Sequence, residues 1–281
     1  MPELVVGVVG LGALGTPLVR NLLAAGRETW VFDVRPEAVA PLEALGARVA
    51  STPAALAAHV DVVLVAVSSG EQVEAVLKGD DPGSGFFATA RPGTILVVHS
   101  TIGAERCLQI ASLAAEHGIS VVDAPVSGRD GGPASAARRE MTYILGGRPE
   151  VLARVRPVLE ISGRTHFDVG EVGAAQDVKL ATNALTLTQM QATHETMRLL
   201  SALGLDPTTA AAILSESSAS NWAVDHWQTI RKAADAPGDA TAIPRKDLAL
   251  ALRTAERLGL PLDLAERALE LVSQPGRGFL G

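Results

Sequence analysis

The stretch "VVGVVGLGALG", residues 5–15, decides the fold of this 281-residue chain. Its valines predict a short strand, and Gly10, Gly12 and Gly15 separate that strand from a helical pattern over 14–26. Gly10 permits a tight turn, Gly12 lets the backbone approach a pyrophosphate, and Gly15 lets helix and strand pack closely. The loop is completed by Leu11, Ala13 and Leu14. A glycine-rich turn without a ligand is the alternative, but the flanking strand and helix favour a dinucleotide-binding loop.

An acidic residue stands at the position, after the second strand, where a dinucleotide-binding fold usually has one. The next β-branched run ends near Asp33, eighteen residues after Gly15, and its carboxylate can hydrogen-bond a ribose diol. A carboxylate repels the 2′-phosphate of NADP, so Asp33 favours NAD. Val34 and Arg35 follow directly, and Arg35 is either a partner for that phosphate or, as we favour, a solvated loop charge. NAD is the expected cofactor, and NADP stays possible.

The first half of the chain alternates strands with helices. Near-continuous apolar runs at 4–10, 28–34, 60–67, 93–100 and 120–126 predict strands. Helical patterns lie between them at 14–26, 36–46, 53–58, 71–78 and 104–117. Apolar strands that alternate with helices are typical of a doubly wound α/β sheet, covered on both faces. Two further strands are expected at 141–147 and 165–170, as an extension of the same sheet.

The second half carries only helical patterns. They cover roughly 173–203, 207–218, 220–234, 246–259 and 261–273. We therefore expect an N-terminal Rossmann domain over 1–165, and over 166–281 an all-helical C-terminal domain that includes a long interdomain helix. The tail, residues 273–281, is expected to be loose.

Composition excludes several classes of function. The net charge is −7 and no run of Lys or Arg occurs, which argues against nucleic-acid binding. The single cysteine, Cys107, cannot form an intrachain disulfide and is expected to pack within a helix. The histidines show no metal-ligand spacing, so no metal is expected. Because no signal segment and no bilayer-long apolar run is found, we expect a cytoplasmic protein that does not bind membranes.

One helix carries an isolated lysine. In "AAQDVKLATNALTLTQMQAT", residues 174–193, no charged residue follows Lys179 until Glu195. At 100° per residue one stripe collects Lys179, Thr182, Asn183, Thr186, Gln189 and Thr193. The stripe is either a solvated face or the polar wall of a cleft between domains, and its hydroxyls and amides favour the cleft. A desolvated lysine can act as a general acid/base, so beside a nicotinamide we expect alcohol–carbonyl interconversion, with Asn183 orienting the lysine or the substrate oxygen.

Four segments, in order, resemble one family. They are "GLGALGTPLVRNLLAAG" (10–26), "DAPVSG" (123–128), "GEVGAAQDVKLATN" (170–183) and "KDLALALRTAERLGLPLDL" (246–264). Together they resemble the short-chain β-hydroxyacid dehydrogenases, of the 3-hydroxyisobutyrate dehydrogenase and tartronate semialdehyde reductase type. The resemblance spans nearly the whole chain. It implies NAD(P)-dependent interconversion of a small β-hydroxy acid and its semialdehyde or keto acid, by a homodimer or homotetramer.

The resemblance also implies roles for single residues. Lys179 matches the catalytic lysine, with Asn183 beside it, and Ser127 and Gly128 match the residues that hold the substrate carboxylate. Thr101 of "STI" (100–102) would approach both the nicotinamide and the substrate. Further cofactor contacts would come from Val67, Ser68 and Lys246. Asp247 is expected to form only a local helix cap or ion pair.

The sequence departs from the family pattern at four positions. Arg129 replaces a glycine in a lengthened loop over 128–140, where it either anchors the substrate carboxylate or points to solvent and pairs with Asp130. Ser68 stands in place of a proline, and Ala175 in place of a glycine. His99 stands where an acid is common, and a buried imidazole is favoured over a catalytic one. These changes leave the identity of the substrate open.

Two other functions are alternatives to the dehydrogenase activity. One is reduction of imines or other carbonyls on the same scaffold, although related imine reductases usually lack this lysine. The other is a dinucleotide-binding protein without catalysis. The set of Lys179, Asn183 and Ser127 favours the dehydrogenase, because a protein that only binds needs no proton donor.

Overall fold

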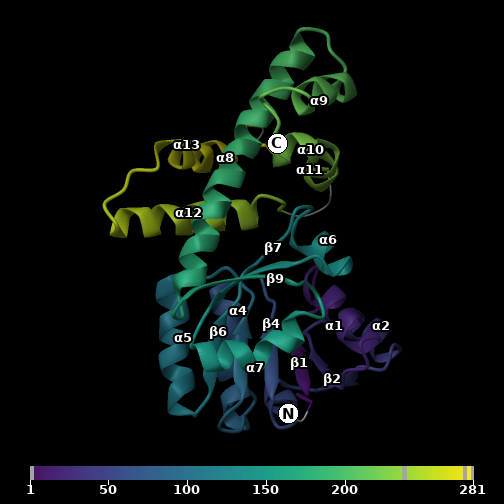
Figure 1. Ribbon diagram of the computed structural model, residues 1–281, viewed down its shortest axis with the longest axis vertical. Coiled ribbons are helices and arrows are strands. Elements are labelled where there is room, and N and C mark those ends of the chain that lie inside the picture. Colours follow the sequence, from purple (N-terminus) through teal and green to yellow (C-terminus); the bar gives the residue numbers. More distant parts are fainter. Residues whose placement is uncertain (1–2, 236–238, 275–276, 280–281) are drawn as a thin grey trace. The chain divides into compact units, whose positions relative to one another are not determined.

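A computed structural model describes residues 3–235, 239–274 and 277–279 (Figure 1). The chain divides into two compact units. Unit 1 comprises Met1–Lys179 and unit 2 comprises Leu180–Gly281.

Unit 1 is built on one sheet, which has nine strands within the described residues. They are β1 (Val6–Val9), β2 (Thr29–Phe32), β3 (Arg48–Val49), β4 (Val62–Val65), β5 (Ile95–Val98), β6 (Ser120–Asp123), β7 (Val126–Ser127), β8 (Thr142–Gly146) and β9 (Thr165–Gly170). Their order is β3-β2-β1-β4-β5-β6-β8-β7, and β9 pairs with β8. All pairs from β3 to β6 are parallel, whereas β8 is antiparallel to β6 and β7.

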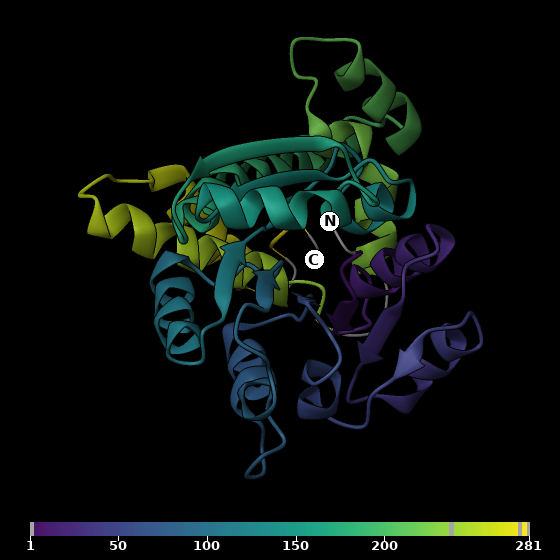
Figure 2. The same ribbon diagram turned by 60° about the horizontal axis from the view of Figure 1, so that its bottom comes forward.

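Helices cover both faces of this sheet. They are α1 (Gly15–Ala24), α2 (Pro36–Glu43), α3 (Pro53–Ala57), α4 (Gly70–Lys78), the 3₁₀ turn η1 (Phe86–Ala88), α5 (Ala104–Glu116), α6 (Gly132–Ala137) and α7 (Pro149–Leu159). One core packs α1, α2, α6 and α7 against the sheet, and the other packs α3, α4 and α5 against the opposite face (Figure 2). The predicted doubly wound Rossmann architecture is confirmed.

The strand order fixes where a ligand binds. Chain direction across the sheet reverses between β1 and β4, and in such sheets the crevice at the carboxyl ends of these two strands takes the ligand. Val9 pairs with Val65, and the amide of Ala66 donates to the carbonyl of Val9 at 2.9 Å. The loop that begins at Gly10 and the loop that begins at Ala66 therefore leave the sheet side by side.

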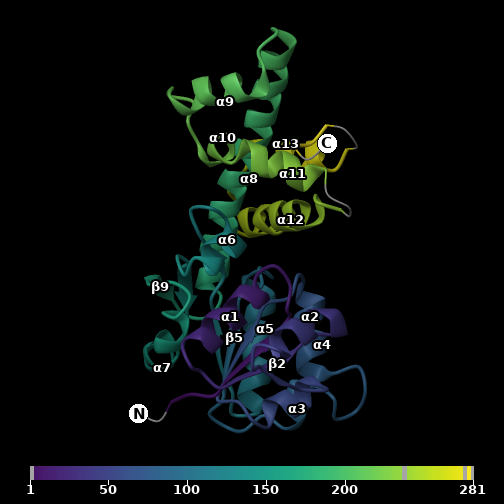
Figure 3. The ribbon, with the colours of Figure 1, turned by 90° about the vertical axis from the view of Figure 1, so that its right-hand side faces the viewer.

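Unit 2 is helical throughout its described residues. The long helix α8 (Ala174–Ala202) begins in unit 1 and continues into unit 2, followed by α9 (Pro207–Ser215), α10 (Trp222–Asp225), α11 (Trp227–Ala234), α12 (Ala242–Arg257) and α13 (Asp263–Val272). Leu180 and Leu187 of α8 lie in one core with Leu248 of α12 and Ala268 of α13. The helices of unit 2 can be followed in Figure 3. The predicted long helix and the all-helical second half are confirmed.

Some element boundaries differ from the prediction. The strand expected over 120–126 ends at Asp123, because Pro125 has no N–H for the sheet ladder, and β7 begins separately at Val126. The single helix expected over 220–234 is divided at His226, whose φ of −107° and ψ of 15° are not helical. Helix α12 begins earlier than expected, at Ala242. Helices α6 and α7 were not predicted.

The expected loose tail is wrong for Phe279. Its side chain is completely buried in the core of unit 2, and the Gln191 Nε2 donates to the carbonyl of Arg277 at 3.3 Å. Residues 275–276 and 280–281 of this tail lie outside the described residues. An aromatic ring that enters the core fixes a segment whose sequence otherwise resembles a flexible end.

Candidate active site

The glycine loop after β1 has the shape that a pyrophosphate requires. Gly10 has a φ of +89°, and a Cβ there would lie 2.6 Å from the carbonyl oxygen of Ala66. A Cβ on Gly15 would collide with the carbonyl of Gly10, so α1 begins against the loop itself. A Cβ on Gly12, by contrast, would meet no atom within 4 Å. The loop therefore leaves open space beside Gly12, near the N-terminus of α1, where an anion is favoured.

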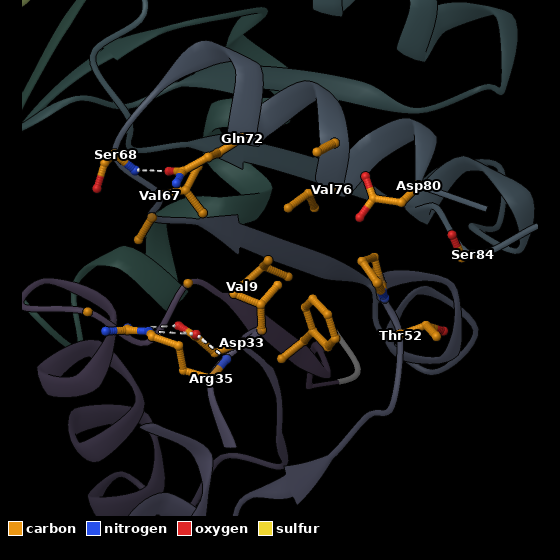
Figure 4. Close-up of a pocket in the computed structure, with 18 of the residues that line it drawn as sticks. Val9, Asp33, Arg35, Thr52, Val67, Ser68, Gln72, Val76, Asp80 and Ser84 are labelled. Atoms are coloured by element: carbon orange, nitrogen blue, oxygen red, sulfur yellow. Dashed lines mark hydrogen bonds and ion pairs between the residues drawn. The ribbon is translucent and has the colours of Figure 1, made fainter. Parts of the chain in front are cut away.

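A pocket of about 630 Å³ opens beside this loop (Figure 4). It is lined by Gly10, Gly12, Asp33, Val34, Arg35, Val67 and Ser68 of the predicted cofactor residues. Lining residues that the sequence did not indicate include Val9, Thr52, Gln72, Val76, Asp80 and Ser84. The pocket size lies within the range of small-molecule sites, and its walls fit the adenosine half of a dinucleotide.

Asp33 is held between the glycine loop and Arg35. Its Oδ2 accepts the amide of Leu11 at 2.7 Å, and its Oδ1 accepts the amide of Arg35 at 2.9 Å. The guanidinium of Arg35 adds two hydrogen bonds, from Nε at 3.1 Å and from Nη2 at 3.2 Å. Burial raises the pKa of Asp33, but the bonds from Arg35 and Leu11 bring it below its usual value. Arg35 is exposed, as predicted for a solvated loop charge, and it also forms an ion pair with Asp33, which was not predicted.

Ser68 explains how the loop after β4 works without a proline. Its amide donates to the Gln72 Oε1 at 2.8 Å, a bond that proline cannot make. The Ser69 hydroxyl in turn accepts the amide of Gln72 at 3.3 Å and caps α4. The pattern Ser-x-x-Gln before a helix is a capping signal, which could have indicated Gln72 from the sequence.

The segment that contains Thr101 is joined to the pocket wall and to α8. The Ser100 hydroxyl accepts the amide of Val67 at 3.1 Å and donates to the Val67 carbonyl at 2.7 Å. On the other side, the Gln176 Oε1 accepts the amides of Ile102 at 2.9 Å and Gly103 at 3.2 Å. The Gln176 Nε2 donates to the Ser100 carbonyl at 3.2 Å. Lys179, which is half-buried, lies about one turn beyond Gln176 on α8.

A buried carboxylate receives the N-terminus of α8. The Asp123 Oδ2 accepts the amide of Gln176 at 3.0 Å, and the side chain has no solvent exposure. Burial raises the pKa of Asp123 from 3.8 to about 6, although the amides of Gln176 and Gly173 oppose this change. A Cβ on Gly146 would collide with the Asp123 Oδ1. Asp123 was not predicted as a site residue, although it is the first residue of "DAPVSG" and directly follows the apolar residues of β6.

The predicted substrate loop, which contains Ser127 and Gly128, lies against α6. Ser127 ends β7, and a Cβ on Gly128 would collide with the Ser135 hydroxyl, which is buried on α6. Position 128 therefore accepts only glycine without rearrangement of α6. Arg129 is exposed, and Asp130 forms an ion pair with Arg138.

In unit 2 one carboxylate connects two of the predicted site residues. The Asn183 Nδ2 donates to the Asp247 Oδ2 at 2.6 Å, and the Lys246 Nζ donates to the Asp247 Oδ1 at 2.8 Å. Asp247 is only 4% exposed. The ion pair expected for Asp247 is confirmed, whereas its bond from Asn183 was not predicted.

Comparison with known proteins places the chain in a family. Residues 5–173 match the NAD-binding domain model of 6-phosphogluconate dehydrogenase, and residues 173–280 match the NAD-binding model of NADP-dependent 3-hydroxyisobutyrate dehydrogenase. A 3-hydroxyisobutyrate dehydrogenase of Pseudomonas aeruginosa is 35% identical over 276 residues, which cover 95% of this chain and 91% of that protein. This chain belongs to the 3-hydroxyisobutyrate dehydrogenase family of β-hydroxyacid dehydrogenases.

Two further members support the assignment. An NAD-dependent L-serine dehydrogenase of the same bacterium is 35% identical, over 95% of this chain and 90% of that protein. The crystal structure of a 3-hydroxyisobutyrate dehydrogenase from Salmonella typhimurium has a TM-score of 0.88 at 31% identity, covering 98% of this chain and 96% of that one. The chain is thus a hydroxyacid dehydrogenase with a nicotinamide dinucleotide as cofactor.

Imine reductases are more distant. A solved imine reductase from a Pseudomonas species is 22% identical with a TM-score of 0.70, and covers 96% of this chain and 93% of that one. At this identity the likeness concerns the fold alone. It gives the imine alternative no support beyond the shared scaffold.

Two side chains of this family member take the structural roles predicted for them. His99 is 3% exposed, and its Nδ1 lies 2.7 Å from the carbonyl oxygen of Ala124. Burial lowers its pKa to about 4, so the imidazole is neutral at pH 7. Cys107 is completely buried on α5, where burial raises its thiol pKa. A buried imidazole and a packed cysteine are confirmed.

The described part of the chain shows neither a metal-binding cluster nor a membrane-spanning helix. Within it, no group of three or more His, Cys, Asp or Glu side chains is arranged to hold a metal ion. Nor does any of its helices combine the length and the apolar character needed to cross a membrane.

Proposed function

We propose that this dehydrogenase oxidises a small β-hydroxy acid with Lys179 as its general acid/base. One observation carries the assignment. Lys179 lies on α8 about one turn beyond Gln176, whose side chain is bonded to the segment 100–103. That segment is bonded through Ser100 to Val67 of the dinucleotide pocket. Lys179 thus belongs to the part of unit 1 that continues from the pocket wall.

Each residue has a distinct task in this proposal. The bound dinucleotide supplies the hydride acceptor. Lys179 accepts the hydroxyl proton of the substrate during oxidation and returns it during reduction. The Ser127 hydroxyl and the Gly128 amide hold the substrate carboxylate, and Thr101 contacts the reacting end. Asn183 and Lys246 complete the set, as the family resemblance implies.

A lysine replacement tests the assignment directly. Lys179→Met should lower kcat by about 10²–10⁴-fold, since the proton acceptor is lost, while NAD affinity changes little. Lys78→Met is the matched control, because Lys78 is an exposed α4 lysine that pairs with Glu74. NADH formation and fluorescence titration with NAD measure the two quantities. Retained turnover in Lys179→Met would remove the lysine from the mechanism, and no turnover of any hydroxy acid by the wild type would favour a protein that only binds.

We propose NAD as the preferred cofactor. The support is the Asp33 carboxylate in the pocket wall, which stays ionised because its pKa is lowered. It can accept bonds from a ribose diol and repels a 2′-phosphate. Arg35 tempers that repulsion, so NADP is a slower alternative.

The substrate we propose carries one carboxylate next to a β-hydroxyl group. Ser127 and Gly128 supply its anchor, and Arg129 beside them, which is exposed, is chemically suited to bind a second carboxylate where a substrate carries one. A panel of short β-hydroxy acids, with and without a second carboxylate, compared between wild type and Arg129→Gly, measures the contribution of Arg129. If the ratio of kcat/KM between Arg129→Gly and wild type is the same for every acid in the panel, Arg129 points to solvent and does not bind the substrate.

We also propose a homodimer or homotetramer in the cytoplasm. Leu199 lies in the last turn of α8 and Leu203 directly follows that helix, and they are 61% and 68% exposed. Such exposed apolar side chains are typical of association surfaces. Leu203→Glu should lower the mass measured by light scattering, whereas Leu45→Glu, on a 55% exposed leucine of unit 1, should not. A wild-type monomer would contradict the proposal.

A further inference from the structure

We propose that Gln176 is a positioning residue, whose side-chain amide holds the segment of Thr101 and the helix of Lys179 in one fixed relation. The inference rests on the proposed role of Lys179. Gln176 touches neither substrate nor cofactor in this scheme. It acts through the two segments that do.

The amide of Gln176 is matched to its surroundings on both sides. Its Oε1 accepts two neighbouring amides, from Ile102 and Gly103, and its Nε2 donates to the carbonyl of Ser100. The side chain has no solvent exposure. A buried group that accepts twice and donates once in fixed directions specifies one geometry, because each unmade bond would cost its full desolvation. Leucine makes none of these bonds, and asparagine is one methylene shorter.

The backbone of Gln176 is held independently of its side chain. Its amide donates to the buried Asp123 carboxylate at the end of β6. The sheet therefore fixes the first turn of α8, and the side chain fixes the segment 100–103 to that same turn. Residues three apart on a helix lie on the same side of it. The turn of α8 that carries Gln176 therefore also fixes the backbone position of Lys179.

The connection reaches the dinucleotide pocket through one more side chain. The Ser100 hydroxyl is bonded to both backbone groups of Val67, which lines the pocket. Val67, Ser100 and Gln176 thus form a continuous set of bonds from pocket wall to α8. A displacement of about 1 Å between reacting groups can cost about 10²-fold in rate, which is the effect that such a connection prevents.

Three variants test the inference. Gln176→Asn and Gln176→Leu should lower kcat by about 10–100-fold, while the Kd of NAD stays within about threefold. Gln176→Glu supplies a readout that a merely structural role would not change. Its protonated form can donate to the Ser100 carbonyl as the amide does, whereas its ionised form places a carboxylate oxygen against that carbonyl oxygen. The kcat ratio of Gln176→Glu to wild type should therefore rise as the pH is lowered from about 9 to about 6.

Matched controls separate positioning from folding. Gln109→Glu changes an exposed amide on α5, and its kcat ratio to wild type should be flat over the same pH range. Asp123 also titrates in this range and accepts the backbone amide of residue 176, so the ratio is measured in the Asp123→Asn background as well, where the introduced carboxyl group titrates without it. Unchanged kcat in Gln176→Leu, or a pH-independent loss in Gln176→Glu that only follows a lowered Tm, would overturn the inference. Turnover retained by Lys179→Met would instead refute the lysine assignment, so the two failures are distinguishable.

Discussion

The amide of Asn183 donates a 2.6 Å hydrogen bond to Asp247, whose other carboxylate oxygen accepts the Lys246 ammonium at 2.8 Å. One almost fully buried carboxylate thus orients two of the residues that the family resemblance assigns to chemistry and cofactor binding. Buried carboxylates of this kind are favourable only while their partners stay in place.

Replacement of Asp247 should therefore reduce activity through its neighbours. Bonds to charged groups contribute about 1.5–3 kcal/mol, so Asp247→Asn should lower kcat/KM by about 10–100-fold. Asp263→Asn, on an exposed residue at the start of α13, is the control. Steady-state kinetics with NAD and substrate varied separately give the result, and an unchanged kcat/KM would show that Asn183 and Lys246 need no such support.

Alanine substitutions at two glycines of the same loop should impair different properties of the protein. A Cβ on Gly12 meets no protein atom, so Gly12→Ala should fold normally but weaken NAD binding by at least about tenfold, because the methyl group occupies pyrophosphate space. A Cβ on Gly15 collides with the Gly10 carbonyl, so Gly15→Ala should lower the free energy of unfolding by about 1–3 kcal/mol. Titration with NAD and urea unfolding separate the two effects. If both variants lost the same NAD affinity and the same free energy of unfolding, the two glycines would not have the different roles assigned here.

Cofactor preference should depend on Asp33 and Arg35 together. Asp33→Ser removes the repulsive carboxylate and releases the Arg35 fork, so the kcat/KM ratio of NAD to NADP should fall by about 10–100-fold. The double variant Asp33→Ser with Arg35→Ala should lose much of the gained NADP activity. Initial rates with both cofactors measure these ratios. A single variant that still prefers NAD by the original ratio would assign the preference to other residues.

Asp123 should make stability depend on pH in a defined direction. Its folded-state pKa is raised from 3.8 to about 6, so its stabilising contribution is complete below about 3.8 and is lost as the pH rises through about 6. Wild type should therefore lose up to about 3 kcal/mol relative to Asp123→Asn between pH 4 and pH 7. Urea unfolding of both proteins at several pH values measures the difference, in which the opposing His99 titration cancels. If the difference in the free energy of unfolding between the two proteins did not change with pH, the raised pKa of Asp123 would be contradicted.

Local sequence was sufficient to predict most of the fold. The glycine loop, the apolar strands and the long helix each have a pattern within a few residues, because turn chemistry and helical periodicity are local properties. Seven of the residues predicted to bind the cofactor line the pocket, because the strand order places the ends of β1, β2 and β4 together.

The supporting contacts could not be predicted in this way. Gln176 is bonded to Ser100, 76 residues earlier, and Asn183 to Asp247, 64 residues later. No spacing rule connects such positions, because tertiary packing alone brings them together. For a different reason, the side-chain contact of Arg35 was not predicted. Its partner is only two residues away, but a surface loop gives no sign of which way a long side chain will turn.

Gly146 and Asp123 occupy the same small volume, since any Cβ at position 146 would overlap the Asp123 carboxylate. The consequence concerns the evolution of the sequence. A smaller residue at 123 does not by itself make room for a side chain at 146, because a Cβ there would also lie 2.7 Å from the carbonyl oxygen of Glu171. Glycine should therefore persist at position 146 among descendants of this protein, whichever residue stands at 123, and a chimera whose replacement strand brings a side chain to position 146 should fold poorly.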